Sequence, residues 1–383
     1  MDAGGTLTPM TATPALRADP WSIRPAEDRD EAALQALARA CPMAGDVTIC
    51  VHREPRFLAL DALLGHAWQV LVAEAAGRAV GCVAWAVRDA YVNGDVRPTG
   101  YVGDLKVHPA ARRSGVGAAL ALRVRHELRG IDPEMPVLLT ALRGNLPVER
   151  LAFGGRYGAL AVPYGTVRVH AIPLFARRPV PRVPRYAVRE ARADDVDELL
   201  ALWAAVAPTR QFAVWRDRAG FEDQLDLAPG LDLSSYLVAR GADGRIAAFL
   251  AIWDQHLLKR TTIVGYGKGM GLFRLGFNLV APVLGAARLP AGGGVLRSLH
   301  AFNVCAGCPD ALRAVVAEAL RRHAGKGHAV LMVGLDVRDP LTAALRGLWS
   351  RPTDVEALVA VTGRLGGCPF LDGRPLHYET ALV

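Results

Sequence analysis

The chain has 383 residues, of which 51% are hydrophobic and 21% are charged, with a formal net charge of +8. This composition is typical of a soluble globular protein of two domains or a little more, and it excludes a disordered chain. The arginines are scattered and form no basic stripe with aromatic residues, so we expect no nucleic-acid partner. Because no run of about eighteen uninterrupted apolar residues occurs, we expect no membrane-spanning helix.

Residues 1–20 are rich in Thr, Pro, Gly and Ala, and they lack a basic stretch followed by an apolar core. We predict a flexible N-terminal tail here and not a secretion signal. Without such a signal, the six cysteines are expected to be reduced thiols in a cytoplasmic protein.

Residues 21–176 alternate strand and helix patterns. Arg24-Pro25-Ala26 ends a first strand and leads into an acidic helix start, as the helix dipole favours. Residues 47–64 carry His52, Arg53, Arg56 and Phe57, which would suit either a carboxylate-bearing acceptor or an exposed, solvated helix. The further predicted elements are a helix over 31–40, strands over 66–75, 80–87 and 100–108, a helix over 115–128, a strand over 137–142, then a short helix and two strands.

A glycine-containing loop joins the strand over 100–108 to the helix over 115–128. Its sequence after His108-Pro109 is Ala-Ala-Arg-Arg-Ser-Gly-Val-Gly. Gly115 and Gly117 remove side chains where a ligand must approach the backbone, and the helix start offers unpaired N–H groups and a positive dipole end. The loop therefore predicts a cradle for an anion such as a pyrophosphate. It contains neither the Gly-Lys-Ser/Thr of a nucleotide P-loop nor the Gly-x-Gly-x-x-Gly of a dinucleotide fold.

Residues 177–185 contain three prolines and four arginines, which predicts a semi-rigid linker. The chain beyond it, residues 186–383, repeats the plan of the first half. Its start, Arg189-Glu190-Ala191, matches Arg24-Pro25-Ala26, because each ends a strand and leads into an acidic helix start. The predicted elements are a helix over 196–207, strands over 235–240, 246–253 and 295–304, a helix over 309–323 and a strand over 329–335.

The spacing Arg-x-x-Gly-x-Gly after a strand that ends in Val-x-Pro resembles the acyl-CoA pyrophosphate loop of the GCN5-related N-acetyltransferase (GNAT) family. The order of elements in both halves is similar to that of GNAT domains. The resemblance implies an α/β (α+β) fold class with tandem GNAT folds, each a mixed, mostly antiparallel sheet flanked by helices. It also implies acetyl-CoA, or another acyl-CoA, as co-substrate, a small-molecule amine as acceptor, and no metal.

The resemblance carries over to individual residues of the first half. It implies that the pyrophosphate is held by Arg112, Arg113, Ser114, Gly115, Val116, Gly117 and Ala118. It implies that Val107, flanked by Leu105 and Lys106, pairs with the pantetheine arm as an extra strand would. Asn145 matches an asparagine that many family members place near the cofactor; its alternative role is a turn or helix N-cap residue before Pro147.

The residues that would transfer protons match the family pattern less well. Where some family members carry a glutamate base, this chain has Tyr101, and the nearest carboxylate is Asp104. A strand bulge would turn Asp104 into the cleft as a base or water holder; otherwise it is a structural carboxylate on the side opposite Tyr101. The family's usual acid, a tyrosine, would fall on Ala152. Tyr157 and Tyr164 are the nearby substitutes, unless they are ordinary packed tyrosines.

The second half lacks the glycine loop and reads Val304-Cys-Ala-Gly-Cys-Pro309 at that place. A cradle with one glycine and a proline loses backbone donors, so we predict that this half does not bind CoA. Cys305 and Cys308 open a helix, where a redox or metal role is conceivable. Small residues packed in a vestigial loop are the simpler interpretation.

Residues 261–294 form an insertion that is apolar, rich in glycine and dotted with cations. Three roles are open to it: a lid or wall beside the acyl chain, a surface that contacts lipid through 265–289, or a core helix that completes the domain. Arg274 and Pro282 argue against a membrane span.

The function that we expect is transfer of an acyl group, most simply acetyl, from CoA to an amine by direct attack in a ternary complex. A covalent enzyme intermediate is not expected, because no cysteine lies near the first-half loop. Two alternatives stay open: a long-chain acyltransferase that uses the apolar insertion, and a non-catalytic acyl-CoA sensor or scaffold. The protein is expected to be a monomer whose halves pack as a pseudo-dimer, or a homodimer.

Overall fold

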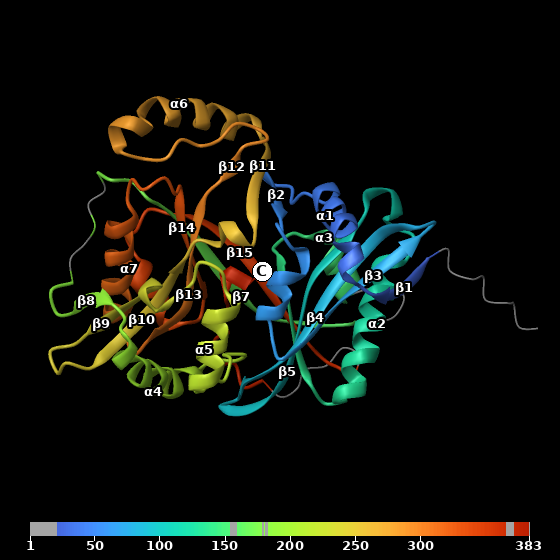
Figure 1. The fold of residues 1–383 in the computed structure, drawn as a ribbon, viewed down its shortest axis with the longest axis horizontal. Coiled ribbons are helices and arrows are strands. Elements are labelled where there is room, and N and C mark those ends of the chain that lie inside the picture. The colour runs from blue at the N-terminus through green and yellow to red at the C-terminus, as the bar shows by residue number, and fades with distance from the viewer. Residues whose placement is uncertain (1–20, 154–158, 178–179, 181–182, 365–370, 383) are drawn as a thin grey trace, which may run out of the picture.

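The computed structural model describes residues 21–153, 159–177, 180, 183–364 and 371–382. One mixed, mostly antiparallel sheet of twelve strands runs through both halves of the chain (Figure 1), which confirms the predicted fold class. Across the sheet the strands are β1 (Ser22–Pro25), β3 (Ala67–Ala75), β4 (Arg78–Val92), β5 (Asp95–Val107), β6 (Pro136–Leu142), β15 (Arg351–Val361), β7 (Val162–Pro173), β14 (Val330–Asp336), β13 (Ser298–Ala306), β10 (Ile246–Trp253), β9 (Tyr236–Arg240) and β8 (Ala187–Glu190).

The two halves exchange strands in the middle of this sheet. β15, from the second half, lies between β6 and β7 of the first half and pairs antiparallel with both. β7 in turn pairs with β14 of the second half over residues 167–173. The sequence predicts two closing strands in each half. Among the described residues, each half instead has one closing strand, β7 in the first half and β15 in the second. The strand beside it comes from the other half.

Alternation along the strands decides which helix covers which face of the first-half sheet. On β4, Val83 and Trp85 pack with α2, whereas Cys82 and Ala84 pack with α1, because successive side chains point to opposite faces. These two helices are α1 (Glu31–Ala40) and α2 (Val116–Ile131), and the short helix α3 (Leu146–Phe153) follows β6.

The second half is built in the same way. Leu250 and Ile252 of β10 pack with α7 (Pro309–His323), whereas Phe249 and Ala251 face α4 (Val196–Val206) and α5 (Arg218–Leu227). The cluster around Phe249 continues into the first half as far as Tyr101. One hydrophobic cluster therefore spans both halves.

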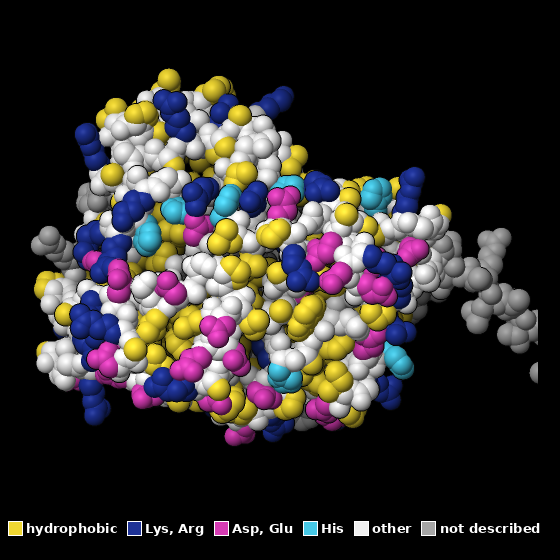
Figure 2. All heavy atoms as spheres, viewed as in Figure 1, with side chains coloured by type: hydrophobic (Ala, Val, Ile, Leu, Met, Phe, Trp, Pro, Cys, Tyr) yellow, Lys and Arg dark blue, Asp and Glu magenta, His cyan; other side chains and the backbone are white. Residues whose placement is uncertain are grey.

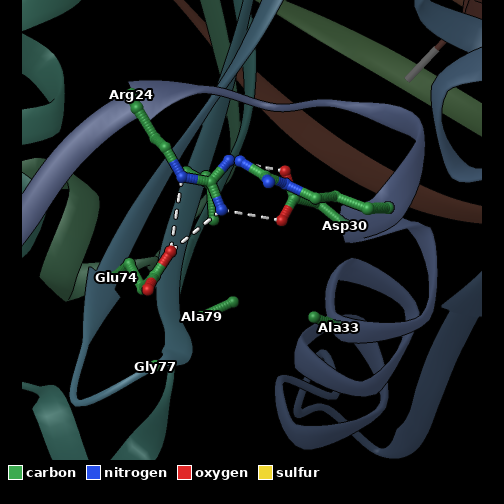
Figure 3. A pocket seen from close by; sticks show the side chains of 8 residues that line it. Arg24, Asp30, Ala33, Glu74, Gly77 and Ala79 are labelled. Atoms are coloured by element: carbon green, nitrogen blue, oxygen red, sulfur yellow. Dashed lines mark hydrogen bonds and ion pairs between the residues drawn. The ribbon is translucent and has the colours of Figure 1, made fainter.

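The repeated start of the two halves has a structural explanation. Arg24 of β1 forms an ion pair with Asp30 before α1 (2.7 Å), and Arg189 of β8 forms one with Asp195 before α4 (2.6 Å). Both aspartates are buried, so each needs its arginine. Figure 3 shows Arg24 between Asp30 and Glu74 in a hollow of the first half, where these charges satisfy one another. We therefore assign this hollow a structural role.

The insertion of the second half forms a projecting unit. β11 (Arg260–Tyr266) pairs with β12 (Val295–Leu296) and with β2 (Val47–His52) of the first half in a separate three-stranded sheet. Between β11 and β12, α6 (Lys268–Leu284) lies at the top of Figure 1, away from the large sheet. Only Ala281 of this helix is fully buried, so α6 is not the core helix that the sequence allowed. Within the described residues, no helix is both long and apolar enough to span a bilayer.

Candidate active site

The loop between β5 and α2 forms an open cradle at the start of a helix. Gly115, directly before α2, has a φ of 95°, in the left-handed region that favours glycine. Space around it is open, since an added Cβ would meet no atom within 4 Å. Arg112, Arg113 and Ser114 are exposed. The loop backbone is therefore accessible to a ligand.

The first turn of α2 supplies unused donors. No hydrogen bond among the described residues uses the N–H groups of Val116, Gly117 or Ala118. These donors point out of the helix start together with its positive dipole end. Arg112 and Arg113 add two cations. Such a set fits the negative oxygens of a pyrophosphate.

Beside this cradle, β5 and β6 diverge. Their parallel pairing covers only Gly100 to Val102 on β5 and Val137 to Leu139 on β6. The end of β5, including Leu105, is therefore not paired to β6. On its other side, Val107 is opposite Gly81 of β4, and its carbonyl oxygen accepts a hydrogen bond from the Cys41 thiol (3.4 Å). This divergence forms an opening between β5 and β6, at an edge of β5 that has no partner strand among the described residues.

Asp104 occupies a bulge in β5. The register with β4 shifts between Cys82 and Ala84, which leaves one extra residue on β5, and Asp104 has a φ of 55°. Its carboxylate contacts two cations: Arg53 Nη2 and Lys106 Nζ, both at 2.5 Å. The bulge thus turns Asp104 toward these charges and not into the regular strand alternation.

Arg53 links Asp104 to a second carboxylate. Its guanidinium is buried, and Nη1 donates to Asp61 Oδ2 (2.8 Å). Burial alone would raise the pKa of Asp104, but the charges of Arg53 and Lys106 outweigh it and hold the pKa well below its usual range. A carboxylate paired in this way is a weak base. Arg53, a candidate for the acceptor wall in the sequence, is committed to these internal partners and unavailable for an acceptor carboxylate.

Tyr101 lies deeper in the same opening. Its hydroxyl is 3.5 Å from Thr140 Oγ1 of β6, and the Arg88 guanidinium stacks over its ring at 5.7 Å. Burial raises the pKa of Tyr101 to about 12. Tyr378, near the last described residues, also hydrogen-bonds with Thr140, and burial raises its pKa. Two tyrosines with protonated hydroxyls therefore meet between β5 and β6.

Lys259, from the second half, completes this group of charges. It directly precedes β11, its side chain is buried, and Nζ donates to the Ala381 carbonyl (2.9 Å). Burial, together with the charge of Arg53 and partly offset by that of Asp104, lowers the pKa of Lys259 to about 7. Sequence reasoning missed Lys259 and Tyr378, because neither belongs to a motif. Only the packing of the halves brings them to the first-half site.

The matching helix start in the second half is closed. α7 begins at Pro309, which has no N–H to donate, and the Cys308 thiol before it contacts the Tyr186 hydroxyl at 3.3 Å. Cys305 is buried in the core. No group of three or more His, Cys, Asp or Glu side chains that could hold a metal occurs in the described part of the chain. The two thiols pack here and leave no anion cradle.

The opening between β13 and β14 is filled by the chain itself. Parallel pairing of these strands ends at His300 and Met332, as it does between β5 and β6. Residues 378–382 occupy the space beyond: the Asn303 N–H donates to Glu379 (3.1 Å), and Thr380 and Tyr378 pack against Gly334. The second half therefore has the family-like divergence of strands without room for a ligand arm.

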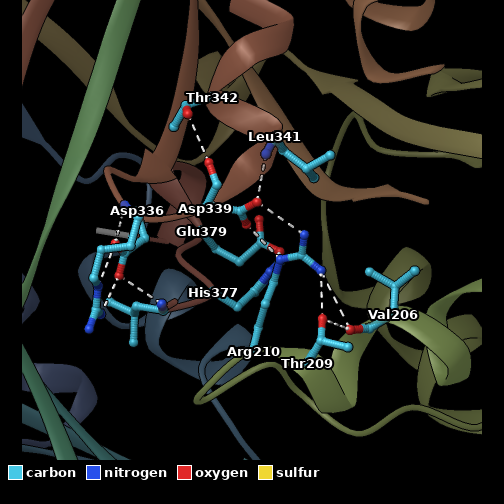
Figure 4. Close-up of polar contacts among 11 residues, drawn as sticks. Val206, Thr209, Arg210, Asp336, Asp339, Leu341, Thr342, His377 and Glu379 are labelled. Atoms are coloured by element: carbon cyan, nitrogen blue, oxygen red, sulfur yellow. Dashed lines mark hydrogen bonds and ion pairs between the residues drawn. The ribbon is translucent and has the colours of Figure 1, made fainter. Parts of the chain in front are cut away.

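A buried polar network holds this closing segment in place. Figure 4 shows His377 and Glu379 next to the Arg210–Asp339 pair. His377 Nε2 is 2.7 Å from Glu379 Oε1, and Arg210 Nε donates to Asp339 Oδ2 (2.7 Å). Burial would raise the pKa of Glu379, but the charges of His377 and Arg216 hold it below its usual value. The network is internally satisfied, which is the mark of a structural cluster.

The remaining predicted residues lie at the edge of the site or outside it. Asn145 precedes α3, and its carbonyl accepts from the Glu149 N–H (3.0 Å), as a helix-flanking residue does. The Tyr164 hydroxyl donates to the Arg374 carbonyl, so Tyr164 is tied to another segment. Arg56 is exposed. Tyr157 lies outside the described residues.

Comparisons with known proteins agree with this geometry. Residues 33–151 match the model of the acetyltransferase (GNAT) family, a range that includes β5, the loop and α2. No curated protein matches the chain in sequence at a significant level. The structural comparison, in contrast, finds many solved structures with the same fold.

Three of these structures illustrate the likeness. N-myristoyltransferase of Saccharomyces cerevisiae with bound myristoyl-CoA has 12% identity and a TM-score of 0.62, covering 91% of this chain and 85% of that one. The GCN5-related N-acetyltransferase of Sphaerobacter thermophilus has 13% identity and a TM-score of 0.56, covering 92% and 98%. The glucosamine N-acetyltransferase region of a fungal multi-domain β-N-acetylglucosaminidase has 17% identity and a TM-score of 0.60, covering 91% and 39%.

These identities are low, so the structural likeness establishes the fold over both halves, while the family match identifies the half that carries the cradle. Together they confirm the resemblance that the loop sequence indicated. Residues 33–151 therefore form a domain of the acetyltransferase (GNAT) family, and the chain as a whole has the fold of GNAT-type N-acyltransferase structures.

Proposed function

We propose that this protein is an acyl-CoA-dependent N-acyltransferase whose first half binds the acyl donor. The observation that carries the proposal is the bare helix start of α2, with unused N–H donors at Val116, Gly117 and Ala118, beside the open edge of β5. The family match over the same residues supports an acyltransferase. Acyl-CoA is the ligand whose pyrophosphate and extended arm suit both features.

In this proposal the donor lies along β5. The pyrophosphate takes the N–H groups of residues 115–118 with Arg112, Arg113 and Ser114 around it. The pantetheine arm follows Leu105, Lys106 and Val107 into the opening between β5 and β6, with Asn145, directly before α3, at its border. The thioester would then lie toward Tyr101 and Asp104.

The reaction joins an amine nitrogen to the acyl carbon and breaks the carbon–sulfur bond. The amine loses one proton and the departing thiolate gains one. Asp104, already paired with two cations, suits the role of holding the amine or a water in place. Lys259, whose pKa is lowered to about 7, suits the role of proton acceptor at neutral pH. The hydroxyls of Tyr101 and Tyr378 can donate hydrogen bonds to the thiolate.

Acetyl-CoA with a small-molecule amine is the pair that we propose first. A long-chain donor is the alternative. A different class of function, an acyl-CoA sensor, is favoured by two observations. The buried Ala152 stands where the family's acidic tyrosine is expected, and the Asp104 carboxylate is already paired with two cations.

Calorimetric titration of the full chain with CoA, acetyl-CoA and palmitoyl-CoA tests the donor site. We expect one site per chain, and the tightest ligand identifies the donor length. Gly115→Glu should abolish binding, but it also strains a left-handed position. Gly117→Glu is the cleaner variant, because a Cβ there meets only Val107 Cγ2 at 3.5 Å. Gly130→Glu, with open space at the other end of α2, is the matched control.

Release of free CoA thiol in the presence of a panel of amines separates the enzyme from the sensor. Amine-dependent thiol release supports the enzyme. Tight donor binding without release under any amine supports the sensor. Unchanged affinity in Gly117→Glu would contradict the cradle itself.

A further inference from the structure

The outward face of α6 is an uncovered row of aliphatic side chains. Leu272 is 73% exposed, Leu275 56%, Leu279 82% and Val283 63%. Their spacing of three, four and four residues places them on one side of the helix. A soluble protein normally presents polar side chains on such a face, because exposed aliphatic surface gains nothing from water.

The body of the protein holds this row in a fixed position. On the inner face, Phe277 stacks with Phe273 and lies 5.8 Å from Phe175, whose ring in turn contacts Trp349. The Asn278 side chain exchanges two hydrogen bonds with the Leu289 backbone (2.8 and 2.9 Å). These contacts hold the inner face of α6 against the rest of the protein, so the leucines on its other face point outward.

Charge around the helix has one sign. Residues 255–309 contain six Lys and Arg side chains and no Asp or Glu. Lys268 is exposed at the start of α6, and Arg288 is exposed just past its end. Asp46, the acidic residue near the helix start, is bound by Arg351 (2.8 Å). In Figure 2 the part of the surface at the top carries yellow and dark-blue side chains.

We propose that α6 docks this protein onto an anionic membrane surface. The helix would lie flat over about 25 Å, with Leu272, Leu275, Leu279 and Val283 among the acyl chains. Lys268 and Arg288 would contact the negative headgroups at either end. A second copy of the chain fits less well, because antiparallel pairing of two such helices would bring Lys268 of one against the Arg288 end of the other.

The docked helix would be coupled to the candidate active site by a short path. β11 connects α6 to Lys259, and its residue Arg260 pairs with His52 of β2, which precedes Arg53. A membrane under α6 would thus lie one small sheet away from the charges around Asp104. The docking itself does not depend on the proposed acyl transfer.

Vesicle flotation of the full chain tests the proposal. The probes are phosphatidylcholine vesicles, alone and with about one third phosphatidylglycerol. We expect binding to the anionic vesicles to be at least about tenfold stronger, and to weaken as salt rises from about 0.05 to 0.5 M. The double variant Leu272→Asp/Leu279→Asp should bind about 100-fold more weakly, since each leucine contributes about tenfold.

The matched control is Leu227→Asp/Val96→Asp, which charges two exposed side chains elsewhere and should leave flotation unchanged. An unchanged circular dichroism spectrum of the α6 variant shows that it is folded. Failure of the wild type to float with anionic vesicles would overturn the proposal, as would equal flotation of the α6 variant. A dimer that the α6 variant dissociates, without any vesicle binding, would assign the face to a second copy instead.

Discussion

α2 and α7 are the same helix in two copies of one fold, and they begin differently. α2 starts after Gly115 with open space and unused N–H groups, beside the divergence of β5 and β6. α7 starts at Pro309, beside a divergence of β13 and β14 that residues 378–382 fill. The strand geometry is shared, so the fold alone does not make a ligand site. A ligand site also needs glycines and open space at the helix start.

The second half has nevertheless kept a part in the chemistry that we propose. It supplies Lys259 and Tyr378 to the opening of the first half, and strand β15 to its sheet. In this proposal the first half binds the donor, and the second half supplies part of the proton transfer. The following predictions test this division.

The largest effect is expected from Lys259→Gln. Loss of the proton acceptor should lower kcat by about 10²–10⁴ with little change in donor affinity. In the wild type, kcat should rise as pH rises through about 7, because only the neutral amine accepts a proton. The variant should lack that rise. Arg260→Gln, at the next residue, is the control, and an unchanged pH profile in Lys259→Gln would remove Lys259 from the chemistry.

Stability gives an independent readout of the same lysine. Its folded pKa of about 7 lies below the unfolded value of about 10.4, so between these values the unfolded chain binds more protons. Stability should therefore rise with pH across this window. Lys259→Met should flatten that slope and raise the melting temperature near pH 7; a lower melting temperature would contradict the buried, costly charge.

Asp104→Asn should destabilise the first half by about 3–5 kcal/mol, because it leaves Arg53 buried with one partner fewer. Denaturant unfolding measures this loss. Since the folded pKa of Asp104 is depressed, its contribution is present above the unfolded pKa and is lost as pH falls toward the folded value. Asp46→Asn, at an exposed pair, is the control and should cost less than about 1 kcal/mol.

Gly117→Glu should weaken CoA binding by about 100-fold, because it brings a negative charge to the anion cradle. Gly130→Glu should leave affinity within about twofold. Calorimetry at equal ionic strength compares the two. Equal loss in both would mean that any glutamate on α2 acts through stability, and the cradle would lose its support.

The smallest effect concerns the second half. The double variant Cys308→Gly/Pro309→Ala restores a glycine and an N–H at the start of α7. We expect no second CoA site, since residues 378–382 still fill the space between β13 and β14. A stoichiometry of two in calorimetry would show that the loop residues alone closed this half.

Much of the fold was predictable from local pattern. The linker composition, the repeated Arg-x-Ala strand end before an acidic helix start, and the strand and helix periods indicated two similar halves. The exchange of β7 and β15 was not predictable, because residues that pair across it lie up to about two hundred positions apart and carry no local signal. From the sequence, a bulge at Asp104 was only one of two possibilities, the one that would turn its side chain into the cleft. The ion pairs of Asp104 with Arg53 and Lys106 were not predicted.

The sequence by itself determined the resemblance to GNAT domains and the half that carries the cradle, because a phosphate loop depends on local backbone conformation and glycine spacing. Tertiary structure decided which charges surround Asp104, why the second half is closed, and that α6 lies outside the core. These depend on burial and on contacts between distant segments. No short stretch of the chain predicts burial or such contacts.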